Sequence, residues 1–203
     1  MWMSTGRLVV AVTGASGAIY AQRFMRQAVR HYREIYLMLS PQALDVARTE
    51  LDVEIACEPF STLAWLGEEH DNVTLCDRKD FYTPPASGSF KHDGMVVVPC
   101  SMGTVGRIAN GVSDDLVSRA ADVCLKEGRK LIVIPREMPW SLIMLRNLTQ
   151  LAEAGATVLP ACPAWYHGPR SLEDLADTVV ARILQSLGVE QTLVAEWMAE
   201  DQG

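Results

Sequence analysis

Short, continuous runs of aliphatic and β-branched residues recur along the chain and predict strands that are buried on both faces. The first run, at 8–12, ends at a turn that contains Gly14 and Gly17. The second, at 35–39, ends at Ser40 and Pro41. Runs of this length, bounded by glycine or proline, are typical of a parallel sheet covered by helices on both faces. The predicted strands are 8–12, 35–39, 94–99, 131–134 and 157–159.

Between these runs, apolar residues recur at the three- or four-residue spacing of one helix face, as in Leu142, Leu145 and Leu148. Pro41 suits the first position of a helix, because the N–H that it lacks would have no intrahelical partner there. Strands that alternate with helices predict an α/β fold with a doubly wound, Rossmann-like parallel sheet. The predicted helices begin near Ala18 and near Pro41, and others cover 116–126, 142–151 and 175–187.

The whole chain, residues 1–203, is predicted to form a single domain, because its length exceeds the usual ~150 residues of one domain by only a third. The segment 57–89 breaks the alternation with proline, glycine, serine and scattered charges, and it is too long for a plain connector. We expect this segment to be irregular and to lie near the site or at contacts between subunits. Residues 199–203 are expected to form a frayed end.

Composition and charge exclude several classes of protein. The chain is 49% hydrophobic and 21% charged, which is ordinary for a globular protein and excludes extensive disorder. Its 18 basic and 25 acidic residues give a net charge of −7, which argues against binding to nucleic acid or to an anionic membrane. Neither a membrane span nor an export signal is evident. The five cysteines are odd in number and lack C-x-x-C spacing, so we expect a cytoplasmic protein without a metal site.

The residues that follow the predicted strands suit a phosphorylated ligand. In a doubly wound sheet, ligands bind beyond the carboxyl ends of the strands, where helix N-termini present backbone N–H groups to an anion. The G-x-x-G turn is a weak signal by itself, and neither G-x-G-x-x-G nor a P-loop is present. One phosphate cradle fits flavin mononucleotide (FMN) better than a dinucleotide. The strand-end residues are Gly14, Ala15, Ser16, Gly17, Ser40, Ser101, Met102, Gly103 and Thr104.

Arg136 and Glu137 are the strongest charged candidates, because they directly follow a predicted strand at the ligand-facing edge of the sheet. Arg119, Lys126 and Arg182 lie on predicted helices, where lysine and arginine more often form solvated surface than a site.

Three other residues carry weaker signals. Tyr166 lies in a loop bounded by prolines, where it could equally cover the hydrophobic core or contact a ligand. None of the histidines shows metal-ligand spacing, and only His167 stands beside another candidate. Cys100 has no evident histidine partner, so we expect a small buried hydrophobe rather than a nucleophile.

Six blocks stand out along the chain: GASGAIY at 14–20, ASGS at 86–89 with DGM at 93–95, PCSM at 99–102, SRAAD at 118–122 with LKE at 125–127, PREMP at 135–139 and PAWYH at 163–167. Together they resemble the UbiX-type flavin prenyltransferases, which serve the decarboxylases of the ubiquinone pathway and of phenolic acid breakdown. The resemblance covers about residues 7–190 and is specific, because all six blocks occur in order.

The resemblance implies a flavoprotein version of the doubly wound sheet and a metal-independent reaction. Reduced FMN would be joined to the dimethylallyl group of dimethylallyl monophosphate, first at flavin N5 and then at C6. The prenylated FMN would pass to a UbiD-type decarboxylase. A homo-oligomer is also implied, commonly a dodecamer of trimers, with each site shared between chains.

Position by position, the resemblance also implies roles for individual residues. The implied FMN contacts are Gly14, Ala15, Ser16, Ser40, Ser101, Met102, Gly103, Thr104 and Arg136. Tyr166 and Arg182 would hold the prenyl phosphate. The implied catalytic group is Glu137, Lys126, Arg119, Ser87, Gly88 and Glu50. Fixed positive charges suit a departing phosphate, and Glu137 or that phosphate suits the removal of the C6 proton. We expect Arg136 to keep Glu137 ionised.

Two other functions stay open: a cysteine decarboxylase of the same fold and cofactor, and a module that only stores or delivers flavin. The decarboxylase group typically has a P-x-M-N-x-x-M-W segment, which is missing here. Three positions depart from the prenyltransferase pattern and concern substrate preference more than the reaction: Gly103 where lysine is common, Trp165 where phenylalanine is usual, and the pair Pro84 and Pro85.

Overall fold

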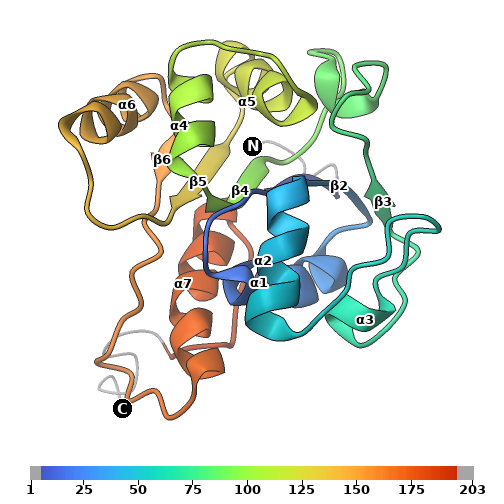
Figure 1. The fold of residues 1–203 in the computed structure, drawn as a ribbon, viewed down its shortest axis with the longest axis vertical. Helices are drawn as coiled ribbons and strands as arrows, with labels where there is room; N and C mark the ends of the chain where they lie inside the picture. Colours follow the sequence, from blue (N-terminus) through green and yellow to red (C-terminus); the bar gives the residue numbers. More distant parts are fainter. Residues whose placement is uncertain (1–5, 196–203) are drawn as a thin grey trace.

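The computed structural model describes residues 6–195, and its six strands form one parallel sheet in the order β3-β2-β1-β4-β5-β6 (Figure 1). The chain starts in the middle of the sheet, builds one half, and then crosses to the other side of β1 to build the second half. The order therefore reverses between β1 and β4, which is where ligands of such sheets bind. The strands are β1 (Arg7–Val12), β2 (Glu34–Leu39), β3 (Val73–Leu75), β4 (Met95–Cys100), β5 (Leu131–Pro135) and β6 (Thr157–Val158).

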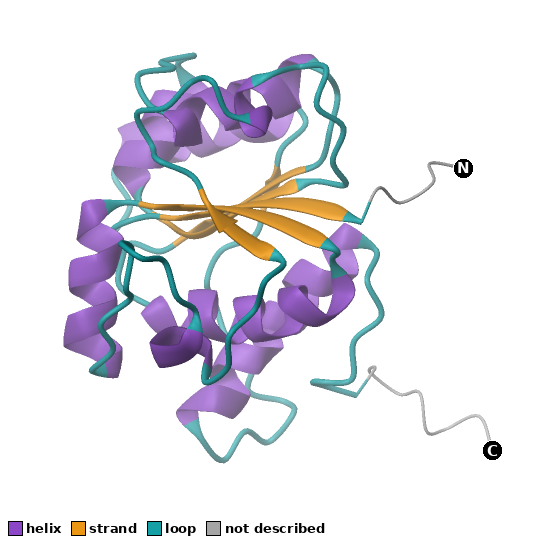
Figure 2. Ribbon diagram, turned by 90° about the vertical axis from the view of Figure 1, so that its right-hand side faces the viewer, coloured by secondary structure: helices purple, strands orange, loops and turns teal. Residues whose placement is uncertain are grey.

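Helices cover both faces of this sheet, as the edge-on view in Figure 2 shows. Successive side chains of a strand point to opposite faces. In β1, Leu8 and Val10 therefore pack with α1, α2, α3 and α7, whereas Val9 and Ala11 pack with α4, α5 and α6. The helical elements are α1 (Ala18–His31), α2 (Pro41–Leu51), α3 (Leu63–Leu66), the 3-10 turn η1 (Pro84–Ala86), α4 (Met102–Ala109), α5 (Leu116–Lys126), α6 (Leu142–Glu153) and α7 (Leu172–Leu187).

The predicted doubly wound α/β sheet is confirmed, and the ends of the five predicted strands differ by at most one residue. The prediction for 57–89 was wrong in part, because this segment supplies α3, η1 and the edge strand β3. Trp65, which is 1% exposed, anchors it in the core. A three-residue strand and a four-residue helix are too short for a periodic pattern to reveal.

In the part of the chain that the structure describes, no helix has the length and apolar character to cross a bilayer. The predicted frayed end at 199–203 lies outside the described residues.

Candidate functional site

The loops that follow β1 and β4 are joined at the point where the strand order reverses. The Thr13 hydroxyl donates to the carbonyl of Pro99 at 2.9 Å and accepts the backbone N–H of Ser101 at 2.8 Å. Arg136 extends this edge, because its backbone N–H donates to the carbonyl of Cys100. Sequence reasoning did not select Thr13, although its place directly after the first strand is the signal that selected its neighbours.

Two of the predicted FMN contacts, Ser40 and Ser101, are helix N-caps at this edge. Ser40 Oγ accepts the Ala43 N–H at 3.0 Å, and Ser101 Oγ accepts the Thr104 N–H at 3.3 Å. Each serine satisfies one orphan N–H of its helix, which stabilises α2 and α4 by about 1 kcal/mol each. Both helix N-termini therefore lie at the carboxyl ends of β2 and β4, where a phosphate would meet them.

The N-terminus of α1 is already occupied by Glu50. Its carboxylate accepts the backbone N–H groups of Gly17 and Ala18, both at 2.8 Å. Burial opposes its ionisation, but hydrogen bonds from Ser16, Ala18 and Gly17 outweigh burial, and the pKa of Glu50 is lowered. A carboxylate of this chain therefore takes these two N–H groups, and phosphate binding by the first glycine turn stays a prediction.

The first turn requires glycine for two different reasons. A Cβ at Gly14 would stand 2.3 Å from the Cβ of Gln42, so this position lets the turn approach α2 closely. Gly17 has a φ of +104°, which side-chain-bearing residues rarely adopt. Ala15 and Met102 are 7% exposed, so these two predicted FMN contacts offer a ligand chiefly their backbone. Gly103, by contrast, faces open space.

Arg136 and Glu137 follow β5 side by side in the sequence, but their side chains have separate contacts. The Glu137 carboxylate accepts the N–H of Met138 at 3.1 Å, and its carbonyl accepts the indole N–H of Trp140 at 2.7 Å. Among residues 6–195, no hydrogen bond or salt bridge joins the side chains of Arg136 and Glu137. The charge of Arg136 instead helps to lower the pKa values of Glu50 and Tyr20, against the larger effect of burial on Tyr20.

Tyr166 and Arg182 line one pocket of about 620 Å³ between α7 and the loop that follows β6. Thr178 fastens this loop to α7, because its hydroxyl accepts the Ala164 N–H at 3.0 Å and donates to Leu175. Arg182 also donates to Gln185 Oε1 at 2.6 Å. The structure thus brings together the two residues predicted to hold a phosphate. The pocket is further lined by Leu159, Cys162, Ala164, His167, Thr178, Val179, Gln185, Ser186, Val194 and Ala195.

Tyr20 is a second residue that sequence reasoning left without a role. Burial and the nearby Cys162 raise its pKa, while Arg136 opposes the shift. Its ring lies against Gly17, where an added Cβ would stand 2.7 Å from Tyr20 Cδ2.

Cys100 is fully buried, and burial raises the pKa of its thiol to about 12, which confirms the expectation of an unreactive small hydrophobe.

The remaining predicted catalytic residues form a second cluster. Arg119 donates from Nε to the carbonyl of Ala86 at 3.2 Å and pairs with Asp122. Lys126 pairs with Glu127 directly beside Gly88, where a Cβ would stand 2.9 Å from Lys126 Nζ. Ser87 Oγ lies 2.8 Å from Ser89 Oγ in the same loop.

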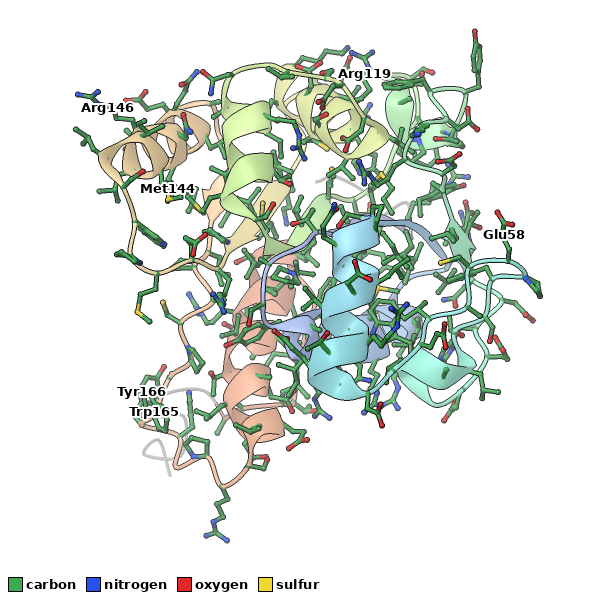
Figure 3. All side chains as sticks on the ribbon, in the orientation of Figure 1. Glu58, Arg119, Met144, Arg146, Trp165 and Tyr166 are labelled. Atoms are coloured by element: carbon green, nitrogen blue, oxygen red, sulfur yellow. The ribbon has the colours of Figure 1, made fainter. Side chains whose placement is uncertain are left out.

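One chain does not bring the two clusters together. The helix α5 ends at Lys126 just before β5 begins, at the amino edge of the sheet, whereas Ser101 and Arg136 follow the carboxyl ends of strands. Six-residue strands separate these edges by about 20 Å. Figure 3 also shows Arg119 and Tyr166 far apart, because α5 and α7 cover opposite faces of the sheet.

Comparison with known proteins shows the family of this chain. A family model described as Flavoprotein matches residues 3–184. The chain is 43% identical over 195 residues to the flavin prenyltransferase UbiX of Pseudomonas aeruginosa, covering 94% of this chain and 93% of that protein. The chain belongs to the flavin prenyltransferases. The enzyme of the same name from Thermoplasma acidophilum is 46% identical over 191 residues, which cover 94% of this chain and 99% of that protein.

Solved structures of flavin prenyltransferase relatives share the fold. AnUbiX (PadA1), solved with FMN and dimethylallyl pyrophosphate, superposes with a TM-score of 0.85 at 39% identity, over 94% of this chain and 96% of that one. A dodecameric FMN-dependent UbiX-like decarboxylase from Escherichia coli O157:H7 gives 0.84 at 36% identity, over 95% and 100%. The peptidyl-cysteine decarboxylase EpiD gives only 0.57 at 19% identity, over 89% and 97%, so it shares the fold alone and does not support the cysteine decarboxylase alternative.

Proposed function

We propose that this chain transfers a dimethylallyl group from a dimethylallyl phosphate to reduced FMN, with bonds formed at flavin N5 and C6. The observation that carries the proposal is the meeting of Tyr166 and Arg182 in one pocket, beside the carboxyl edge of the sheet. A solved relative with 39% identity, described with FMN and dimethylallyl pyrophosphate, supports the same pair of ligands.

The carboxyl edge fits FMN chemically. The N-terminus of α4 and the hydroxyl of Ser101 supply donors at the point where the strand order reverses. Gly103 has no neighbour within 4 Å of an added Cβ, so this turn leaves space for a ligand. When bound, reduced FMN would supply a nucleophilic N5, which displaces the phosphate, and a nucleophilic C6, which bonds to the alkene of the transferred group as C6 loses its proton and the neighbouring alkene carbon gains one.

The residues of this chain hold the phosphate, shield the allylic group from water and remove the proton from C6. Arg182 and Tyr166 bind the phosphate, and the guanidinium stabilises the charge that grows on its oxygens as the allylic C–O bond breaks. Trp165 and Tyr166, which are 72% and 63% exposed, supply aromatic faces to the allylic cation and exclude water when covered. Glu137, exposed beside this edge, accepts the proton lost from C6.

A second copy of the chain completes the site. Ser87, Gly88, Arg119 and Lys126 lie on the far edge of the same chain, so their predicted part in the reaction requires a neighbouring subunit. The dodecameric relative supports an oligomer of this kind. The charge of Lys126 and Arg119 would then meet the phosphate across the subunit contact.

The remaining assignments concern the reaction partners. The prenylated FMN goes to a UbiD-type decarboxylase in the cytoplasm. We take dimethylallyl monophosphate as the donor, because one arginine, Arg182, and one phenol, Tyr166, are a donor set of the size that one phosphate group needs. The net charge of −7 and the lack of an apolar spanning helix among residues 6–195 fit a partner that is neither nucleic acid nor membrane.

The test is anaerobic incubation of the protein with reduced FMN and dimethylallyl monophosphate, followed by mass spectrometry of the released flavin. We expect the mass of FMN to rise by one dimethylallyl unit. A parallel reaction with dimethylallyl pyrophosphate measures donor preference. Release of unmodified FMN from both reactions would contradict the proposal and favour a protein that only stores flavin.

A further inference from the structure

We propose that Arg107, a residue to which no role has been assigned above, sets the direction of the hydrogen bonds that reach Ser101 and thereby makes the Ser101 hydroxyl a donor to bound flavin. This inference rests on the proposed function only in taking Ser101 as a flavin contact. Arg107 acts through Thr104, so it is a positioning residue.

The chain of contacts begins at Arg107 on α4. Its Nη2 donates to Thr104 Oγ1 at 3.2 Å, three residues earlier on the same helix face. A guanidinium donates and never accepts, so Thr104 Oγ1 is the acceptor in this contact. The Thr104 hydroxyl proton therefore needs a separate acceptor.

The Thr104 hydroxyl has one available hydrogen-bond acceptor. Its side chain is 1% exposed, and a buried hydroxyl proton without an acceptor is costly. Ser101 Oγ lies 3.0 Å away, and no other acceptor of this hydroxyl is found within residues 6–195. Thr104 therefore donates to Ser101.

The same count of hydrogen-bond donors and acceptors then decides the role of Ser101. Its Oγ already accepts the Thr104 backbone N–H at 3.3 Å, and the Thr104 hydroxyl fills its second lone pair. The Ser101 proton must point away from α4, and the residue is half-buried at the carboxyl edge of the sheet. Ser101 thus presents a hydrogen-bond donor, which suits a phosphate oxygen, a flavin carbonyl or an unprotonated ring nitrogen.

The loop before α5 restrains Arg107 only weakly. Its Nε lies 3.4 Å from Asp114 Oδ1 without forming a hydrogen bond, and Asp114 is itself 60% exposed. Without the guanidinium, Thr104 Oγ1 would be free to accept from Ser101, and the Ser101 proton would turn inward for part of the time. The flavin would then lose a fixed donor.

The experiment measures the dissociation constant of FMN by quenching of flavin fluorescence for Arg107→Met, Thr104→Val and the double variant. Arg107→Met keeps the apolar stem and removes the donor, and we expect affinity to fall about three- to tenfold, the value of one neutral hydrogen bond. Thr104→Val should weaken binding at least as much. The double variant should bind no worse than Thr104→Val alone, because Arg107 has no route to Ser101 without the hydroxyl.

Two matched variants separate this role from a merely structural one. Asp114→Asn removes the ion-pair partner of Arg107 and should leave FMN affinity unchanged, whereas Arg107→Lys, which keeps a positively charged donor, should restore part of it. Three results would each overturn the inference. Arg107→Met could bind FMN as tightly as wild type, the losses of affinity could add in the double variant, or Asp114→Asn could lose as much affinity as Arg107→Met. Thermal unfolding of each apo variant checks folding. If Arg107→Met does not fold, Arg107→Gln replaces it in the cycle, because an amide both donates and accepts and no longer forces one direction.

The outcome is distinguishable from failure of the proposed reaction. Wild-type protein that binds FMN but releases it unmodified would contradict prenyl transfer and leave the Arg107 test intact. Wild-type protein that makes prenylated FMN, together with an unaffected Arg107→Met variant, would contradict the role of Arg107 alone. Wild-type protein that does not bind FMN would overturn both.

Discussion

Arg23 Nε donates to Asp177 Oδ1 at 2.8 Å, which joins α1 to α7 across 154 residues of sequence. A second hydrogen bond makes the pair bidentate, and the side chains are only 23% and 11% exposed. Bidentate arginine–carboxylate pairs fix geometry as well as adding energy. The helix α1 begins at the first glycine turn, and α7 carries Arg182, so this pair sets the position of the phosphate pocket relative to the strand ends.

Removal of Asp177 should therefore cost substantial stability. We expect Asp177→Asn to lower the free energy of unfolding by about 2–3 kcal/mol, because Arg23 would keep its charge in a mostly buried place without its counterion. Urea denaturation measures this change. Glu173→Gln, an exposed substitution in the first turn of the same helix, is the control and should stay within about 0.5 kcal/mol of wild type. Equal effects of the two substitutions would contradict the role given to the pair.

Glu50 should make stability depend on pH in one direction. Its pKa is lowered from the usual 4.5 in the folded protein, so its carboxylate contributes stability above about pH 4.5 and loses it as the pH falls through the folded-state pKa. Glu50→Gln should reduce the unfolding free energy at pH 7 by about 1 kcal/mol or less, the usual value of a carboxylate at an exposed helix N-terminus.

The gap between wild type and Glu50→Gln should narrow as the pH falls below about 4.5, and it should close once the pH is below the lowered folded-state pKa of Glu50. Denaturation curves at pH 7 and pH 3.5 measure it, with Glu54→Gln as the exposed control. A gap that is equal at both pH values would show that the charge of Glu50 is not what holds the α1 N-terminus.

Substitution by alanine at two glycines near the strand ends should change the stability of the protein in opposite directions. Gly103→Ala adds a Cβ to open space in the first turn of α4 and should stabilise the apo-protein by about 0.5 kcal/mol, because alanine loses less backbone entropy. Gly14→Ala forces a Cβ to within 2.3 Å of Gln42 Cβ and should destabilise it. The cost of Gly14→Ala is expected to be about 1–3 kcal/mol, typical of overpacking. Thermal unfolding of both variants measures these changes. A Gly14→Ala variant as stable as wild type would mean that the turn moves readily.

Glu137→Gln tests the proposed base. The variant keeps the size of the side chain and its hydrogen bond to Met138, so FMN affinity should survive while prenylated product falls by about 100-fold or more. Cofactor affinity and product formation are measured on the same sample. Because the structure shows no Arg136–Glu137 ion pair among the described residues, loss of folding is not expected. Near-normal turnover would remove Glu137 from the reaction and leave the departing phosphate as the base.

Subunit complementation tests whether the site is shared. Arg182→Ala and Lys126→Ala change opposite clusters of one chain, and each variant alone should be inactive. If the two clusters meet across a subunit contact, oligomers reassembled from an equal mixture should recover about a quarter of the sites, because each site then draws its halves at random from two chains. A mixture that stays inactive after confirmed exchange of subunits, or a fully active monomer seen by light scattering, would contradict the shared site.

Local pattern was enough to predict most of the sheet. Buried strands such as 131–134 are continuous apolar runs, and helices such as 116–126 show a single apolar stripe, so hydrophobic spacing alone indicates them. The strand-end rule then pointed to Ser40, Ser101 and Arg136, because in a parallel sheet all carboxyl ends share one edge. These inferences required no knowledge of which strands are neighbours.

Contacts between distant segments were decided only by the tertiary structure. The sequence by itself did not indicate that Glu50 takes the N–H groups of α1, because 33 residues separate it from Gly17. It also did not show that Glu137 turns away from Arg136, or that Lys126 ends at the opposite edge of the sheet from Arg136. Hydrophobic periodicity reports which face of an element is buried, whereas the partner of a polar side chain depends on how the elements pack around the sheet.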